Sequence, residues 1–191
     1  MVLLLVLLAV NCLIATWNAW VVGKMWDLAD GFFAKLVLWS ALVQSVVGYS
    51  SAILLGVVTG LYYNGRIDEH FIVLAVDFWY VLVIFPALGT GLVLWLHSIQ
   101  MAFRHPGILS WTTAGWNTYA MAHNVGDALQ HLPEASEGAG ELFSSIGKGE
   151  DGWKVWLVIL VVLASIGLGA LLTWAVFALS RRSAGSLAYD V

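Results

Sequence analysis

The sequence predicts an all-α integral membrane protein, with four transmembrane helices in an up-and-down bundle and an amphipathic interfacial helix between the third and fourth. Three observations predict this fold class. The 191 residues are 61% hydrophobic and only 10% charged, with a mean hydropathy of +0.87, whereas soluble domains are roughly 45–50% apolar and about 25% charged. Four apolar stretches reach the roughly 20 residues that a helix needs to cross a hydrocarbon core. One long polar segment separates the last two stretches.

The four predicted spans form a single membrane domain over residues 1–191. Charged side chains are nearly absent from them, since the third contains only Asp77 and the fourth only Lys154. The first span lacks the basic start and the small-residue cleavage site of a signal peptide, so we expect it to be retained as a helix. The spans cover about residues 1–23, 36–63, 70–103 and 153–180, with a loop over about 104–152 and a tail over 181–191.

Charge and aromatic residues near the ends of the spans bear on orientation. Arg181 and Arg182 follow the last span directly, which favours a cytoplasmic C-terminus, and four spans would place both termini on that side. Lys24, Lys35 and other basic residues flank the opposite face, so the charge count alone does not discriminate. Tyr62 and Tyr63 are expected at one interface. Seven tryptophans are expected at the other: Trp17, Trp20, Trp26, Trp39, Trp95, Trp153 and Trp156.

Several functional classes have no support in the residues. The net charge is −4 with no basic patch, so nucleic-acid binding is not expected. Cys12 is the single cysteine, which rules out an intrachain disulfide or a thiolate cluster. The chain has no phosphate loop, no calcium loop and no serine–histidine–acid signature. We therefore expect no enzymatic activity and no resident cofactor.

Small residues recur every fourth position along the second predicted span. Such a stripe lets two helix backbones approach closely, which favours association in lipid. The fourth span repeats the pattern more briefly. The stripes predict either internal packing of one bundle or an interface between subunits. Their residues are Gly48, Ala52, Gly56 and Gly60, which follow Gln44, and then Ser165, Gly169 and Thr173.

Polar residues inside the spans are few, and each is a candidate because it is costly in lipid. Asp77 lies about two turns into the third span. It predicts either a hydrogen-bonding cluster, at the depth of Asn11 and Thr173, or ion handling together with Gln44. His97 lies near the far end of the same span. A haem held by two histidines is not expected there, because no other span offers a second one.

The loop contains a strongly amphipathic helix, predicted over residues 111–132 and ended by Pro133. A short second helix is expected around Phe143. The apolar side of the first is predicted to carry Trp111, Ala114, Thr118, Met121, Ala122, Val125, Leu129 and Leu132, and the polar side Asn117, His123, Asn124, Asp127, Gln130 and His131.

Three side chains on that polar side, His123, Asp127 and His131, follow one another at intervals of four residues. That spacing suits a metal ion, because such side chains are neighbours on a helix. The outer two stand about 12 Å apart at a rise of 1.5 Å per residue, so His105 or Glu134 would have to complete a site. A solvated polar face or a surface for a partner fits the same residues. We expect the solvated face first and the metal site as the alternative.

Three functions are consistent with these features. The first is a structural or assembly subunit of a membrane complex or array, cellular or virion, that packs through its small-residue stripes and its amphipathic helix. Its expected partners are the lipid bilayer and either further copies or other membrane subunits. The second is a channel or transporter that uses Asp77 in an oligomeric polar path. The third is a metal-binding or redox subunit that uses the loop histidines.

Overall fold

The computed structural model describes residues 2–146 and 152–186, and these form five helices with no strand among them. Three of the helices are long and apolar enough to cross a membrane, namely α2, α3 and α5. The predicted helical fold class is therefore confirmed, with three candidate membrane spans in place of the four that were expected. The helices are α1 (Val2–Met25), α2 (Gly31–Tyr63), α3 (Glu69–Arg104), α4 (Ile108–Ser144) and α5 (Gly152–Ser186).

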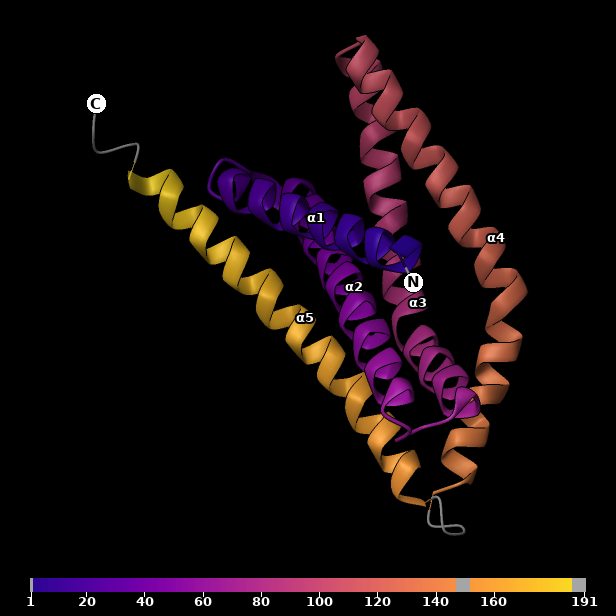
Figure 1. Ribbon diagram of the computed structural model, residues 1–191. Helices are drawn as coiled ribbons and strands as arrows, with labels where there is room; N and C mark the ends of the chain where they lie inside the picture. Colours follow the sequence, from indigo (N-terminus) through magenta and orange to yellow (C-terminus); the bar gives the residue numbers. More distant parts are fainter. Residues whose placement is uncertain (1, 147–151, 187–191) are drawn as a thin grey trace.

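Two packing clusters hold the helices together (Figure 1). The larger lies around the α2–α3 turn, where residues of four helices meet, among them Leu54, Phe71, Leu142 and Val162. The smaller joins α1, α2 and α5 at the other end, around Ala19 and the partly buried Phe177. The turn beside the larger cluster follows the predicted chemistry, because Gly65 adopts a φ of +65° that favours glycine.

The polar loop is folded differently from the prediction. It forms one continuous helix of 37 residues that runs antiparallel to α3 and packs against it (Figure 1). Pro133 lies inside α4, so the prediction that it ends the helix, with a short second helix beyond, is wrong. A proline within a helix costs about 3 kcal/mol. Ala128 and Ala135 are buried on either side of it, and we infer that this packing offsets the cost.

The path of α4 reverses the expected direction of the last helix. Because α4 carries the chain back along α3, α5 begins beside the α2–α3 turn, where Lys154 Nζ lies 4.0 Å from Asp68 Oδ2 and 5.3 Å from the Phe71 ring centroid. Trp153 and Trp156 therefore lie at the same end as Tyr62. The prediction that all seven tryptophans share one interface is wrong, since it assumed a loop that returned to its own side.

The first helix runs obliquely across the upper parts of α2 and α5 (Figure 1). Asn11 Nδ2 donates to Ser51 Oγ of α2 at 2.9 Å, and Ser180 Oγ of α5 donates to the Trp20 carbonyl at 2.5 Å. The Cβ of an alanine at Gly23 would lie 2.7 Å from the Cβ of Ser180. The close approach of the two backbones thus fixes α1 against α5. The C-terminal ends of both helices lie on the same side of the molecule.

Candidate functional site

The outward surface of α4 carries two strips of different character. An apolar strip consists of Trp111, Val125, Leu129 and Phe143, which are 48%, 38%, 76% and 53% exposed. The polar strip lies on the other flank, and its side chains are exposed or half-buried. It consists of His123, Asp127, Gln130, His131, Glu134, Glu137 and Glu141.

The face of α4 that packs on α3 is made of small residues. Ala114, Ala128, Ala135 and Ala139 are buried, and alanine allows close helix approach. Gly138 lies directly against the Asp77 carboxylate, so that an added Cβ would overlap it. The predicted apolar side is thus only partly the buried side, because Leu129 faces outward.

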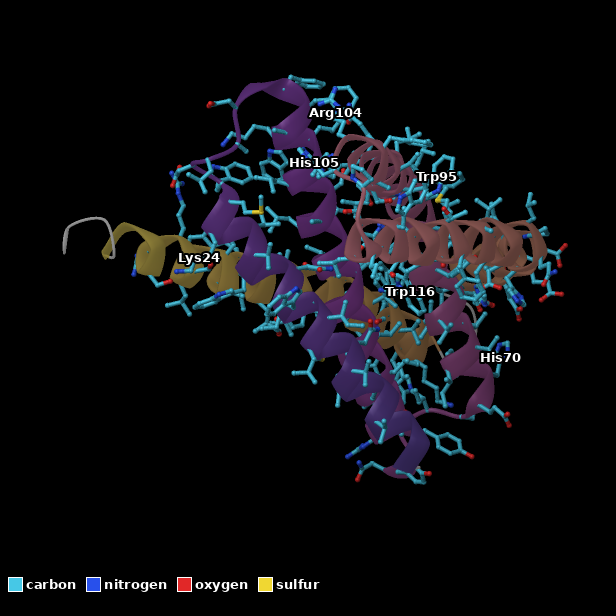
Figure 2. All side chains as sticks on the ribbon, turned by 90° about the horizontal axis from the view of Figure 1, so that it is seen from above. Lys24, His70, Trp95, Arg104, His105 and Trp116 are labelled. Atoms are coloured by element: carbon cyan, nitrogen blue, oxygen red, sulfur yellow. The ribbon has the colours of Figure 1, made fainter. Side chains whose placement is uncertain are left out.

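The candidate metal ligands are not brought together. His123 Nδ1 lies 3.3 Å from Asp127 Oδ2, and His131 Nδ1 lies 4.0 Å from Glu134 Oε2, each within α4. His105 follows the last residue of α3, at the opposite end of the hairpin from Glu141 (Figure 2). Within the described ranges, no group of three or more histidine, cysteine or acidic side chains is placed to hold a metal ion.

The small-residue stripe of α2 is divided by the fold. Gly48 lies beneath α1, where an added Cβ would come within 3.2 Å of the Ala15 Cβ, and Ala52 is buried. Gly56 and Gly60 lie farther along, and a Cβ at either would meet nothing within 4 Å. The stripe of α5 packs inward. Ser165 and Thr173 are buried, and a Cβ at Gly169 would lie 2.9 Å from the Val46 carbonyl oxygen of α2.

The polar residues inside the spans lie in separate places. Asp77 is half-buried against α4, and Asn11 bonds Ser51. Thr173 Oγ1 is buried without a hydrogen-bond partner among the described residues. The structure therefore does not join Asp77, Asn11 and Thr173 in one cluster. His97 lines an apolar groove of about 410 Å³ beneath the α1–α2 turn.

Gln44 is different, because it lies where three cavities adjoin. Their volumes are about 450, 220 and 170 Å³, and Gln44 lines all three. Its Nε2 donates to the Ala87 carbonyl at 2.7 Å and to Thr90 Oγ1 at 2.9 Å. These bonds hold the side chain against α3 just after Pro86. We call the three cavities together the polar groove; it is bounded by α1, α2, α3 and α4.

The polar groove is also lined by polar side chains that sequence reasoning did not single out as a site. Asn18 of α1 and Asn117 and Asn124 of α4 face it, together with Tyr80 of α3. In Figure 2, Trp116 projects from α4 toward α1, and it lines the same cavity as Asn18. A signal for them exists in the sequence. Asn18 follows Asn11 by seven residues, and Asn124 follows Asn117 by seven, which places each pair on one helix face.

Outside these cavities, an ion pair joins the α1–α2 turn to the last turns of α5. Arg181 donates from Nη2 and Nε to Asp27 Oδ1 and Oδ2, at 2.7 and 2.9 Å. These hydrogen bonds, and to a smaller degree the positive charge of Arg181, hold the pKa of Asp27 below its usual 3.8. Both side chains are exposed, so we expect the pair to locate the α1–α2 turn rather than to add much stability.

No protein-family model, curated protein or solved structure matches the chain.

Proposed function

We propose that the protein is an assembly subunit of a membrane complex, in which the polar strip of α4 docks against a neighbouring subunit. The observation that supports this most directly is the course of α4 along α3. Whichever part of α3 crosses the lipid, α4 lies beside it, and its outward face carries carboxylates such as Asp127 and Glu137. Ionisable groups at membrane depth face a protein interior or a water-filled space rather than acyl chains.

The two strips of α4 have different expected surroundings. Leu129 and Phe143 on the apolar strip are exposed and suit lipid. Glu134 and Glu141 on the polar strip are 83% and 56% exposed and do not. Lipid alone would not solvate the polar strip of this helix, and water alone would not suit its apolar strip. A second copy of this chain, or another membrane subunit, would cover the polar strip while leaving the apolar strip in lipid.

The open part of the α2 stripe supports the same proposal. Gly56 and Gly60 offer a surface on which a partner helix could approach closely. Since Gly48 and Ala52 are already used inside the chain, only this part of the stripe is available to a neighbour.

The proposal extends to membrane topology. We propose that all five helices cross the membrane, α1 beside α2 and α5, and α4 beside α3. Five crossings place the start of α1 and the end of α5 on opposite faces, in place of the shared face that four spans predicted. Of the seven basic residues among those described, five lie toward the end formed by the α1–α2 turn and the last residues of α3 and α5. By the positive-inside bias this end faces the cytoplasm, and α1 begins on the other face. The five are Lys24, Lys35, Arg104, Arg181 and Arg182, against Arg66 and Lys154.

Cysteine cross-linking in native membranes tests the docking surface. In a Cys12→Ser background, which leaves no other thiol, single cysteines are placed at Gln130 and at Glu137 on the polar strip. We expect both to form a cross-linked species larger than one chain with a short bifunctional reagent. Mass spectrometry of that species identifies the neighbour as a second copy or as another subunit.

The matched control is a cysteine at Leu168, which is 49% exposed on α5 and lies outside the polar strip. We expect no cross-link from this position. A chain that remains monomeric by native mass spectrometry, with no cross-link from Gln130 or Glu137, would contradict the proposal.

A further inference from the structure

We propose that the polar groove binds a small monovalent cation, either ammonium and its short alkyl derivatives or an alkali metal ion. The groove is lined by residues of one chain, on α1, α2, α3 and α4. Its Asp127 also belongs to the polar strip, so each variant is tested both for cation binding and for assembly. Four observations carry it: unused oxygen acceptors, a single negative charge, an unpartnered phenol, and the size of the cavities.

The acceptors come first. Both hydrogen bonds of Gln44 are donated by its Nε2, so its Oε1 is left without a donor from the described residues. The side chains of Asn18, Asn117 and Asn124 make no hydrogen bond within the described ranges. Asn18 and Asn117 are half-buried and Asn124 is exposed, so their carboxamides are accessible to a ligand. Their carbonyl oxygens are ligands that replace the hydration shell of a small cation.

The charged side chains that line the groove indicate whether it binds a cation or an anion. Asp127 is the one carboxylate among the described residues that line the three cavities, and no lysine, arginine or histidine is among them. An anion would therefore meet a carboxylate and no positive partner. Divalent cations in proteins take several carboxylates or keep many waters. One carboxylate with neutral oxygens suits a single positive charge.

Aromatic residues complete the site. Tyr80 Oη is buried and has no hydrogen-bond partner among the described residues, and Tyr80 lines the same cavity as Asp127 and Asn124. A phenol oxygen in that position can accept from an N–H donor or coordinate an ion. The rings of Trp79 and Trp116 also line the groove. An indole face attracts cations, and this contact favours an alkylammonium ion over a bare metal ion.

The adjoining cavities are large enough for such a ligand. The largest, about 450 Å³, extends toward Asn11 and Ser51 of the α1–α2 contact. The two smaller ones lie against α4, and the smallest, about 170 Å³, contains Asp127 and would hold the positive charge of the ligand. His123 lies 3.3 Å from Asp127 and is the side chain that competes with a cation for this carboxylate.

Binding to the full chain in lipid nanodiscs tests the proposal. Radiolabelled methylammonium and rubidium are the two probes, and chloride is the control for non-specific uptake. We expect saturable binding of at least one cation, displaced by its unlabelled form, and none of chloride. Methylammonium binding that potassium does not displace would identify the organic ion, and the reverse result would identify the metal ion.

Variants locate the site. Asp127→Asn keeps the shape and removes the charge, and Asn124→Leu removes an acceptor. We expect each to weaken binding about tenfold, which corresponds to about 1.4 kcal/mol, as for a hydrogen bond to a charged group. Leu129→Ala lies on the same helix, on the apolar strip outside the groove, and should bind like the wild type. Thermal unfolding and native mass spectrometry confirm that each variant is folded and assembled.

Two outcomes overturn the proposal. One is a folded wild-type protein that binds neither cation. The other is cation binding that Asp127→Asn and Asn124→Leu leave unchanged, which would place any cation site elsewhere.

Discussion

Helices α4 and α5 invite comparison, because both are long and both pack along an apolar helix of the bundle. α5 has 35 residues and α4 has 37. The exposed side of α5 is apolar from Leu160 to Leu179, as a helix in contact with lipid requires. The exposed side of α4 is half apolar and half ionisable. Similar length and position in a bundle therefore do not imply the same surroundings.

The two helices also differ in how closely they approach their neighbours. α5 is held to α2 at Gly169, where an added Cβ would lie 2.9 Å from one backbone atom and 3.0 Å from another. α4 is held to α3 at Gly138, where the nearest group is the Asp77 side chain. Backbone cannot move aside as a carboxylate can, so α5 is the less tolerant of the two.

The largest expected effect follows from that difference. Gly169→Leu would force α5 off α2, and overpacking of this kind costs about 1–3 kcal/mol or more. Because backbone is the obstacle, we expect more than about 3 kcal/mol, and loss of the folded chain in thermal unfolding and protease resistance. Gly56→Leu is the control, since its Cβ has open space. It should leave the monomer folded and weaken only assembly, and a Gly169→Leu chain as stable as wild type would contradict the close contact.

The next effect concerns the outward surfaces. Leu171 of α5 is 62% exposed, and a lysine in its place should cost about 2.5–3.5 kcal/mol if it faces lipid near the middle of the bilayer. Gln130→Lys on the polar strip of α4 should cost much less. Membrane insertion efficiency with glycosylation reporters measures both. Equal losses from the two substitutions would show that the surfaces share one environment.

A smaller effect is expected where α4 meets α3. Gly138→Leu would displace the Asp77 side chain and loosen α4, at about 1–3 kcal/mol. Hydrogen exchange should rise along α4 while α5 stays protected. Gly140→Leu lies two residues away in open space and serves as the control. If exchange in α5 rose as much as in α4, the two helices would not be independent.

The smallest effect belongs to the ion pair between Asp27 and Arg181. Its stabilisation is present above the ordinary pKa of Asp27, 3.8, and is lost as the pH falls through the lowered pKa of the folded chain. Asp27→Asn should therefore lower the melting temperature slightly at neutral pH. At a pH below the lowered pKa of Asp27, the substitution should leave the melting temperature unchanged. A difference that persists at low pH would show that the variant acts through something other than the charge.

The three apolar spans could be predicted because hydropathy over 20 residues is a property of the sequence alone. The turn at Asn64 and Gly65 was equally readable. The course of α4 was not, because Pro133 is a local stop signal and its effect was outweighed by contacts with α3. Once α4 ran the length of α3, the direction of α5 and the positions of Trp153 and Trp156 changed with it.

The polar groove was predictable only in part. Gln44 can be recognised from the sequence, because it is a polar residue in an apolar span. Asn18 and Asn124 lie on different helices far apart in sequence, and nothing local shows that they face one space. Their spacing of seven from Asn11 and Asn117 marks a face, but which faces meet is decided by helix packing. Tyr80 could not be recognised from the sequence either, because a tyrosine in a predicted span more often marks the membrane–water interface.

The contact between the first and last helices has a consequence for how the protein is made. Trp20 and Gly23 of α1 pack against Ser180 of α5. Trp20 and Ser180 are 160 residues apart in the sequence. Helix α1 leaves the ribosome before α5, the helix whose surface it packs against. The smaller packing cluster can therefore close only after α5 has been synthesised, and until then α1 must be sheltered by lipid or by the insertion machinery.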